Sequence, residues 1–126
     1  MRVLLDTATL IFAVESPEKI GKRAVVAMKN TNNALELSVV SLTEIAIKTS
    51  LGKLRFSAEM ARRAIRDLDL RILPYTSEHA FRFFDLPLHH RDPFDRQIIA
   101  QALSEQVAVA TPDEAFALYR GVKTVW

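Results

Sequence analysis

Four acidic residues stand where one predicted element of secondary structure gives way to the next. Asp6 directly follows an apolar segment, Asp113 comes three residues after another, and Glu44 follows a third. Asp95 lies two residues after Pro93, where a helix is predicted to begin. Carboxylate oxygens suit Mg²⁺ and Mn²⁺, and such ions activate water and stabilise the leaving oxygen of a phosphodiester. The four acids are therefore candidates for a metal site that hydrolyses a phosphodiester.

Each acid also has an ordinary structural explanation, because carboxylates are favourable near helix N-termini. Asp6 could cap the helix that follows it. Glu44 could close a capping box with Ser41. Asp113 lies within a Thr-Pro-Asp-Glu segment, residues 111–114, in which Thr111 could cap a helix and Glu114 could close a capping box. Taken singly, each acid is more readily explained as structural than as catalytic.

A second aspartate lies close to Asp95 and is assigned a structural role. Asp92 directly precedes Pro93, and an Asp followed by Pro at the first helical position is a common helix start. We therefore assign Asp92 to the N-cap. This leaves Asp95, in the first turn, as the candidate ligand.

The predicted elements alternate between strand and helix. Continuous apolar runs, typical of strands buried on both faces, occupy residues 2–5, 36–40, 71–73, 107–110 and 122–126. Helical spacing occupies residues 18–29, 42–51, 58–68, 78–84, 93–105 and 112–119. This alternation predicts one α/β domain over residues 1–126, a three-layer α/β/α sandwich around a mostly parallel sheet.

A mostly parallel sheet would bring the acids together. Ligand sites of such sheets form at the carboxyl ends of the strands, at a switch in strand order. Asp6, Glu44 and Asp113 each follow their own strand, and Asp95 joins them if its helix starts at the same edge. Carboxylates gathered in this way repel one another and raise one another's pKa, and a divalent cation removes that conflict.

Composition excludes several other classes of protein and site. The chain has 126 residues, 49% of them hydrophobic, and a formal net charge of +2, so a nucleic-acid partner is permitted but not required. The absence of cysteine excludes disulfides and thiolate metal sites. No GxGxxG or P-loop pattern and no apolar run of about 20 residues is present. The first apolar run meets Asp6 almost at once, so we expect no signal peptide and a cytoplasmic location.

Four motifs occur in order along nearly the whole chain, and together they resemble the PIN-domain family and, within it, the VapC-type toxins of toxin–antitoxin pairs. The motifs are Leu-Leu-Asp-Thr at 4–7, Ser-Leu-Thr-Glu-Ile-Ala-Ile-Lys at 41–48, His-Arg-Asp-Pro-Phe-Asp-Arg at 90–96 with Ala-Gln-Ala at 100–102, and Thr-Pro-Asp at 111–113. The block around residues 92–102 is the most specific. Ala8 departs from close relatives, which often carry histidine there, but this position lies outside the acidic set.

The resemblance implies a fold, an activity and partners. It implies a PIN-like α/β/α fold and a Mg²⁺ or Mn²⁺ site that cleaves RNA, with Asp6, Glu44, Asp95 and Asp113 as the acidic quartet. Asp6 and Asp95 are the expected direct ligands, and the other two would complete the site directly or through water. It also implies a protein antitoxin, for which an apolar groove near residues 42–68 is the expected receiver, and a homodimer.

The remaining polar residues receive weaker predictions. The histidines His79, His89 and His90 lack a paired ligand pattern. His89 and His90 follow Pro87 in a predicted turn, so we predict surface or packing roles for these two. Five cations near the expected site are candidate phosphate contacts, although Arg96 could instead pair with an acid: Lys48, Lys53, Arg55, Arg91 and Arg96.

Two other functions remain open. A non-catalytic nucleic-acid-binding or interaction module on the same fold would have its acids explained by capping. A small-molecule phosphatase would share the acidic chemistry without acting on RNA.

Overall fold

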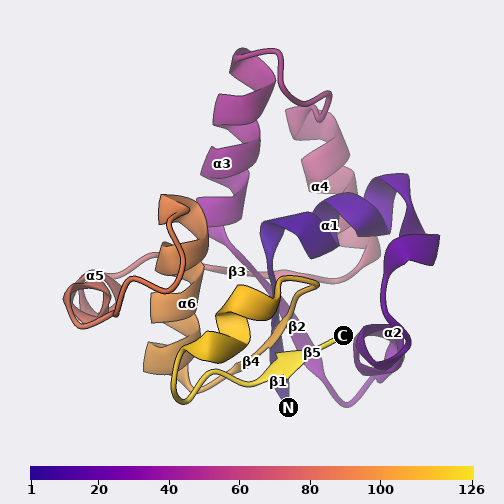
Figure 1. Cartoon of the computed structure of the whole chain (residues 1–126). Coiled ribbons are helices and arrows are strands. Elements are labelled where there is room, and N and C mark those ends of the chain that lie inside the picture. The colour runs from indigo at the N-terminus through magenta and orange to yellow at the C-terminus, as the bar shows by residue number, and fades with distance from the viewer.

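Five parallel strands form the middle layer of a three-layer α/β/α sandwich in the computed structural model, which describes residues 1–126 (Figure 1). The strands are β1 (Arg2–Leu5), β2 (Ala34–Ser38), β3 (Arg71–Leu73), β4 (Ala108–Ala110) and β5 (Thr124–Val125). Their order across the sheet is β3-β2-β1-β4-β5, and every neighbouring pair is parallel. The predicted fold class is therefore confirmed, and the switch in strand order lies between β1 and β4.

Helices cover both faces of this sheet (Figure 1). They are α1 (Thr7–Glu15), α2 (Lys22–Lys29), α3 (Val39–Ser50), α4 (Ala58–Asp67), α5 (Ser77–Phe84) and α6 (Pro93–Glu105), with 3-10 turns η1 (Pro17–Lys19) and η2 (Glu114–Leu118). One core joins α1, α2 and α4 to the sheet, and the other joins α6 and η2 to its opposite face. No helix has the length and apolar character needed to cross a bilayer.

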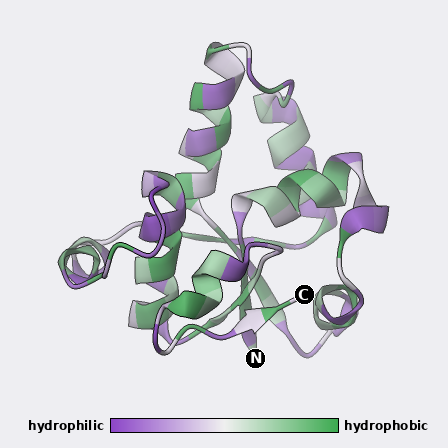
Figure 2. Ribbon diagram, in the orientation of Figure 1, coloured by the Kyte–Doolittle hydropathy of each residue, from purple (hydrophilic) through white to green (hydrophobic).

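The alternation of side chains along β1 explains the two cores. Val3 and Leu5 point to one face and belong to the core that contains Leu10 of α1, whereas Leu4 points to the other face and packs with Ile98 of α6. All five side chains are fully buried, as the continuous apolar run predicts for a strand covered on both sides. Figure 2 shows hydrophobic residues along these central strands.

Several predicted boundaries are wrong, among them that of the last strand, which covers only Thr124–Val125 and not 122–126. The strand predicted at 36–40 ends at Ser38, because the Ser38 hydroxyl accepts a hydrogen bond from Val40 N (3.0 Å) and begins α3 three residues earlier than predicted. The helix predicted at 18–29 is divided into two elements. The 3-10 turn η1 ends at Lys19, and α2 begins at Lys22, after Gly21. The helix predicted at 112–119 is the shorter 3-10 turn η2, whereas the bounds of α6 agree with the prediction.

A buried histidine ties α5 to α6 and to the first strand. His79 is fully buried; its Nδ1 accepts a hydrogen bond from Thr76 N (3.1 Å), and its Nε2 lies 2.9 Å from Glu105 Oε2. The other oxygen of Glu105 accepts from Arg2 (3.0 Å). The hydrogen bond with His79, followed by that with Arg2, lowers the pKa of Glu105. His79 therefore has a structural role between these elements.

We expect His79→Ala to lower the free energy of unfolding by about 2–4 kcal/mol, because the change opens a cavity and leaves Thr76 N and Glu105 without this partner. Urea denaturation followed by circular dichroism measures the effect. Arg82→Ala, on the exposed side of the same helix, is the control and should change the value by no more than about 0.5 kcal/mol. Equal effects of the two substitutions would contradict a structural role for His79.

Candidate metal centre

The four candidate acids converge at the carboxyl edge of the sheet. Asp6 follows β1, Asp113 lies three residues beyond β4, Glu44 lies on α3 after β2, and Asp95 lies in the first turn of α6. Burial raises the pKa of Asp95 to about 7, and the charges of Asp92, Asp6 and Glu44 add to that effect. Burial likewise raises the pKa of Asp6, with a contribution from the charge of Asp113. Each of the four is therefore within electrostatic range of another.

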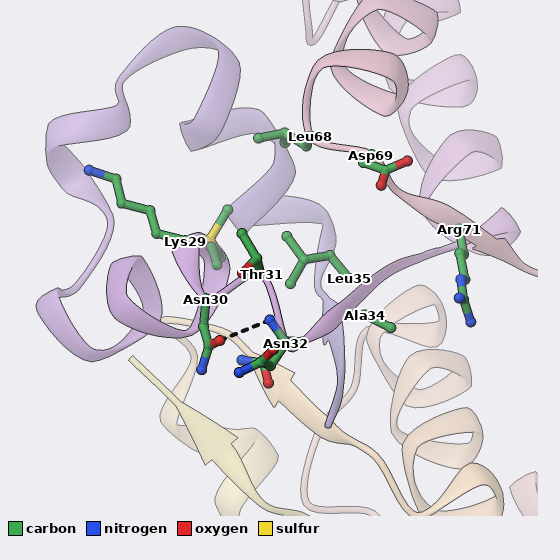
Figure 3. A pocket seen from close by; sticks show the side chains of 11 residues that line it. Lys29, Asn30, Thr31, Asn32, Ala34, Leu35, Leu68, Asp69 and Arg71 are labelled. Atoms are coloured by element: carbon green, nitrogen blue, oxygen red, sulfur yellow. Dashed lines mark hydrogen bonds between the residues drawn. The ribbon is translucent and has the colours of Figure 1, made fainter.

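A separate polar hollow lies at the opposite edge of the sheet and does not share this chemistry. It has a volume of about 450 Å³ and is lined by residues from the end of α2, the starts of β2 and β3, and the turns before these strands (Figure 3). Asp69 is the single acid in its lining, and Lys29 and Arg71 accompany it. The acidic cluster at the carboxyl edge is thus a distinct feature of the molecule.

Asp6 is buried and held by hydroxyl groups on both oxygens. Its Oδ1 accepts hydrogen bonds from Thr9 N (2.8 Å) and Thr9 Oγ1 (2.6 Å), so Asp6 caps α1 as the structural alternative predicted. Its Oδ2 accepts from Thr111 Oγ1 (2.5 Å). Thr7, in contrast, donates to Ser41 Oγ (2.9 Å) and not to an acid. The Asp6 carboxylate is therefore fixed in position by Thr9 and Thr111.

Glu44 does not form the predicted capping box. Because α3 begins at Val39, Glu44 lies in the second turn of the helix, and Ser38 supplies the cap. Glu44 Oε2 accepts a hydrogen bond from Lys48 Nζ (2.6 Å), while Oε1 is buried and has no hydrogen-bond partner. An unpartnered buried carboxylate oxygen is costly, so this atom is available to a ligand.

Lys48 brings a positive charge to the cluster. The hydrogen bond to Glu44 raises the pKa of Lys48, and the charges of Asp92 and Asp95 also act in this direction. Its side chain is 42% exposed and its ammonium group is bonded to Glu44, so Lys48 is a partly accessible cation next to the acids. Arg96, by contrast, donates to the carbonyl oxygen of Leu86 (3.2 Å) and forms no ion pair with an acid.

Asp92 caps α6 as predicted, whereas Asp95 has different contacts. Asp92 Oδ1 caps α6 by accepting hydrogen bonds from Phe94 N (2.8 Å) and Asp95 N (3.1 Å). The Asp95 carboxylate has no backbone donor, and its Oδ2 lies 3.1 Å from His90 Nε2. Asp95 is therefore not explained by helix capping.

His90 is the residue of the site that sequence reasoning missed. Its Nε2 lies 2.8 Å from Asp113 Oδ2 as well as 3.1 Å from Asp95 Oδ2, and its side chain is mostly buried. Asp113 Oδ1 accepts from Ala115 N (2.9 Å), so Asp113 also caps η2. His90 precedes Asp95 by five residues in a loop, and no periodic pattern fixes where a loop side chain points. The surface or packing role predicted for His90 did not include these contacts with two acids.

The residues present fit a hard divalent cation. The cluster offers carboxylate oxygens without a thiolate, which is the donor set that Mg²⁺ and Mn²⁺ use. Glu44 Oε1 has no partner, and burial together with the charges of Asp92, Asp6 and Glu44 raises the pKa of Asp95. A cation next to these carboxylates would give Glu44 Oε1 a partner and would favour the ionised form of Asp95.

Comparisons with known proteins are consistent with this fold. A sequence model of the PIN domain matches residues 3–122. Crystal structures of DNA-bound VapBC2 from Rickettsia felis and DNA-bound VapBC from Salmonella typhimurium contain chains with a TM-score of 0.69, at 17% and 18% identity; each alignment covers 98% of this chain and 97% and 96% of the other.

A third similar structure is VapBC-5 from Mycobacterium tuberculosis, a member of the VapBC family of toxin–antitoxin systems. Its TM-score is 0.61 at 20% identity, covering 98% of this chain and 97% of that chain. No curated protein sequence matches the chain. At these identities the structural likeness shows the fold alone, whereas the PIN-domain match extends over most of the sequence.

The raised pKa of Asp95 predicts that, in metal-free protein, the ionised form of this carboxylate lowers the stability of the fold in a pH-dependent way. The folded protein retains the proton up to about pH 7, whereas an ordinary Asp loses it near 3.8. The stability that Asp95 contributes is therefore present below about pH 4 and lost as the pH rises to about 7. In EDTA, we expect Asp95→Asn to raise the melting temperature relative to wild type at pH 8 but not at pH 4.

Thermal unfolding followed by fluorescence at the two pH values measures this difference. The control is Asp67→Asn, which removes an exposed carboxylate and should show no such dependence on pH. A stabilisation by Asp95→Asn that is the same at both pH values would contradict the expected crowding of charge.

Proposed function

This chain belongs to the PIN-domain family, and we propose that it is a Mg²⁺- or Mn²⁺-dependent endoribonuclease and the toxin of a toxin–antitoxin pair. The observation that carries the proposal is that the four acids meet at the carboxyl edge of the sheet, where Glu44 Oε1 is buried without a partner and burial and neighbouring acidic charges raise the pKa of Asp6 and Asp95. The similarity to structures of VapBC proteins supports the toxin assignment.

We assign the metal to the quartet of acids. Asp6 and Asp95 would ligate it directly, and Glu44 and Asp113 would complete the site directly or through water. When bound, the cation would supply an activated water and stabilise charge on the leaving oxygen. Thr111 keeps the Asp6 carboxylate oriented, which supports its role as a fixed ligand.

Lys48 is the candidate contact to the RNA backbone. Its ammonium group is paired with Glu44, and its side chain is partly exposed to solvent, so it could approach a phosphate next to the metal. Such a contact would make RNA binding weaken as salt concentration rises.

The non-catalytic alternative is less well supported. It explains Asp6 and Asp113, which do cap helices. It does not explain Glu44 and Asp95, whose carboxylates have no backbone donor. A non-catalytic module would show no Mn²⁺ site by isothermal titration calorimetry, and a phosphatase would hydrolyse a small phosphate monoester while leaving RNA intact.

We expect Asp6→Asn to reduce metal-dependent RNA cleavage by at least about 100-fold, since even residues that only support a metal ligand contribute about 10- to 100-fold. Cleavage of a labelled RNA pool in Mg²⁺ or Mn²⁺ measures the rate, and EDTA should abolish it. Asp67→Asn is the matched control and should keep the wild-type rate. Cleavage by Asp6→Asn at the wild-type rate, or cleavage that survives EDTA, would refute the proposed mechanism.

The antitoxin would bind in an apolar groove between α3 and α4. This groove has a volume of about 400 Å³, and seven of its ten lining residues are hydrophobic, among them Leu42, Ile45, Phe56 and Ile65. It falls within residues 42–68, where the sequence resemblance suggested a receiver. An amphipathic segment of a partner protein fits an apolar groove of this kind.

We expect Ala46→Glu to prevent neutralisation by the antitoxin without reducing RNA cleavage. Ala46 lines the groove and is exposed, so a charge there blocks an apolar partner without disturbing the core. Growth after induction, with and without co-expressed cognate antitoxin, measures the effect. Ser50→Glu, on the same helix but outside the groove lining, should still be neutralised; rescue of both variants would argue against this groove.

The homodimer implied by the family resemblance stays a prediction. An exposed apolar surface is available for it, because the rings of Phe81 and Phe84 stack at a centroid distance of 6.2 Å and are 67% and 82% exposed. Surfaces of this kind often mark contacts between proteins. Sedimentation of the purified chain as a monomer at micromolar concentration would contradict a homodimer.

A further inference from the structure

The two ring nitrogens of His90 have different hydrogen-bonding roles. Its Nδ1 accepts a hydrogen bond from Asp92 N (3.1 Å), and a ring nitrogen that accepts a hydrogen bond does not carry a hydrogen. The hydrogen of the imidazole therefore resides on Nε2. Nε2 is hydrogen-bonded to Asp113 Oδ2 at 2.8 Å and lies 3.1 Å from Asp95 Oδ2, so its single N–H stands next to both acids.

The ring of His90 is held in place from the remaining sides. Its backbone N donates to Tyr119 Oη (2.9 Å), and the ring makes an edge contact with Phe116 at a centroid distance of 6.1 Å. Both aromatic residues belong to the buried core. The Nε2–H group is thus directed at the carboxylates by the packed interior of the protein.

We propose that His90 is a positioning residue of the acidic cluster, which holds Asp95 and Asp113 together through its Nε2–H and does not itself bind the metal. The proposal rests on the metal site proposed above and goes further by assigning a role to a residue outside the quartet. Asp95 belongs to α6 and Asp113 is the N-cap of η2, and His90 is the side chain that contacts both carboxylates.

His90 lies near enough to the acids to be mistaken for a third ligand. The potential ligand atoms of His90, Asp95 and Asp113 all lie within 4.8 Å of one another. A ligating imidazole, however, presents a nitrogen lone pair to the metal and donates its other N–H elsewhere. In this ring the lone pair is on Nδ1 and points to the Asp92 amide. The ligand set is then made of oxygen alone, which favours Mg²⁺ or Mn²⁺ over Zn²⁺.

The test compares three variants in Mn²⁺ binding by isothermal titration calorimetry. His90→Ala removes the donor and should weaken Mn²⁺ binding by about 10- to 100-fold. His90→Gln supplies a side-chain N–H of similar reach and should bind Mn²⁺ nearly as well as wild type. His89→Ala removes the neighbouring, exposed histidine and should leave the affinity unchanged. Pulsed electron paramagnetic resonance of the Mn²⁺-loaded wild type should show no nitrogen coupling from a directly bound imidazole.

The outcomes separate this inference from the proposed function. Wild-type protein that binds no Mn²⁺ overturns both. Wild type that binds Mn²⁺, with His90→Ala binding equally well, overturns only the positioning role. A nitrogen coupling from a directly bound imidazole that is present in wild type and absent in His90→Gln also overturns the positioning role, because His90 would then be a ligand. Should His90→Ala fail to fold, the spectrum of wild type and the affinity of His90→Gln decide the question.

Discussion

The repulsion between buried carboxylates is the constraint on which this structure depends. Parallel strands end at one edge of the sheet, so the residues that follow β1, β2 and β4 share one region of space. When those residues are acidic, burial and mutual repulsion disfavour their ionised forms, which is what the raised pKa values of Asp6 and Asp95 express. Hydroxyl donors, Lys48 and His90 offset this cost only in part, and a cation would complete the compensation.

Capping and metal binding are not exclusive explanations for an acid in this fold. Asp6 and Asp113 each satisfy an orphan backbone amide at the start of a helix and still face the cluster. A carboxylate has about four lone-pair positions, so one oxygen can anchor the backbone while others remain available. The helix start fixes the rotamer of the acid, which makes a cap a good support for a ligand.

The sequence was sufficient for the fold class, the edge at which the acids meet and the capping role of Asp92, because these follow from apolar periodicity and local chemistry. The sequence was insufficient where a residue far away in the chain determines a helix boundary or the direction of a side chain. The early start of α3 follows from the Ser38 side chain, which bonds both Val40 N and Gln101 on α6. His90 points into the cluster because Tyr119, 29 residues away, holds its backbone. Such contacts exist only after the chain has folded.

The segment between α5 and α6 is fixed at several points along residues 85–92. Arg96 binds the carbonyl oxygen of Leu86, Tyr119 binds the amide of His90, and Asp92 closes the segment as a helix cap. Surface connections generally accept insertions and deletions. These contacts fix the length of this segment, because one added residue would move His90 away from Tyr119 and from the acids. Among homologues, we expect its length to vary less than that of the turn between α3 and α4.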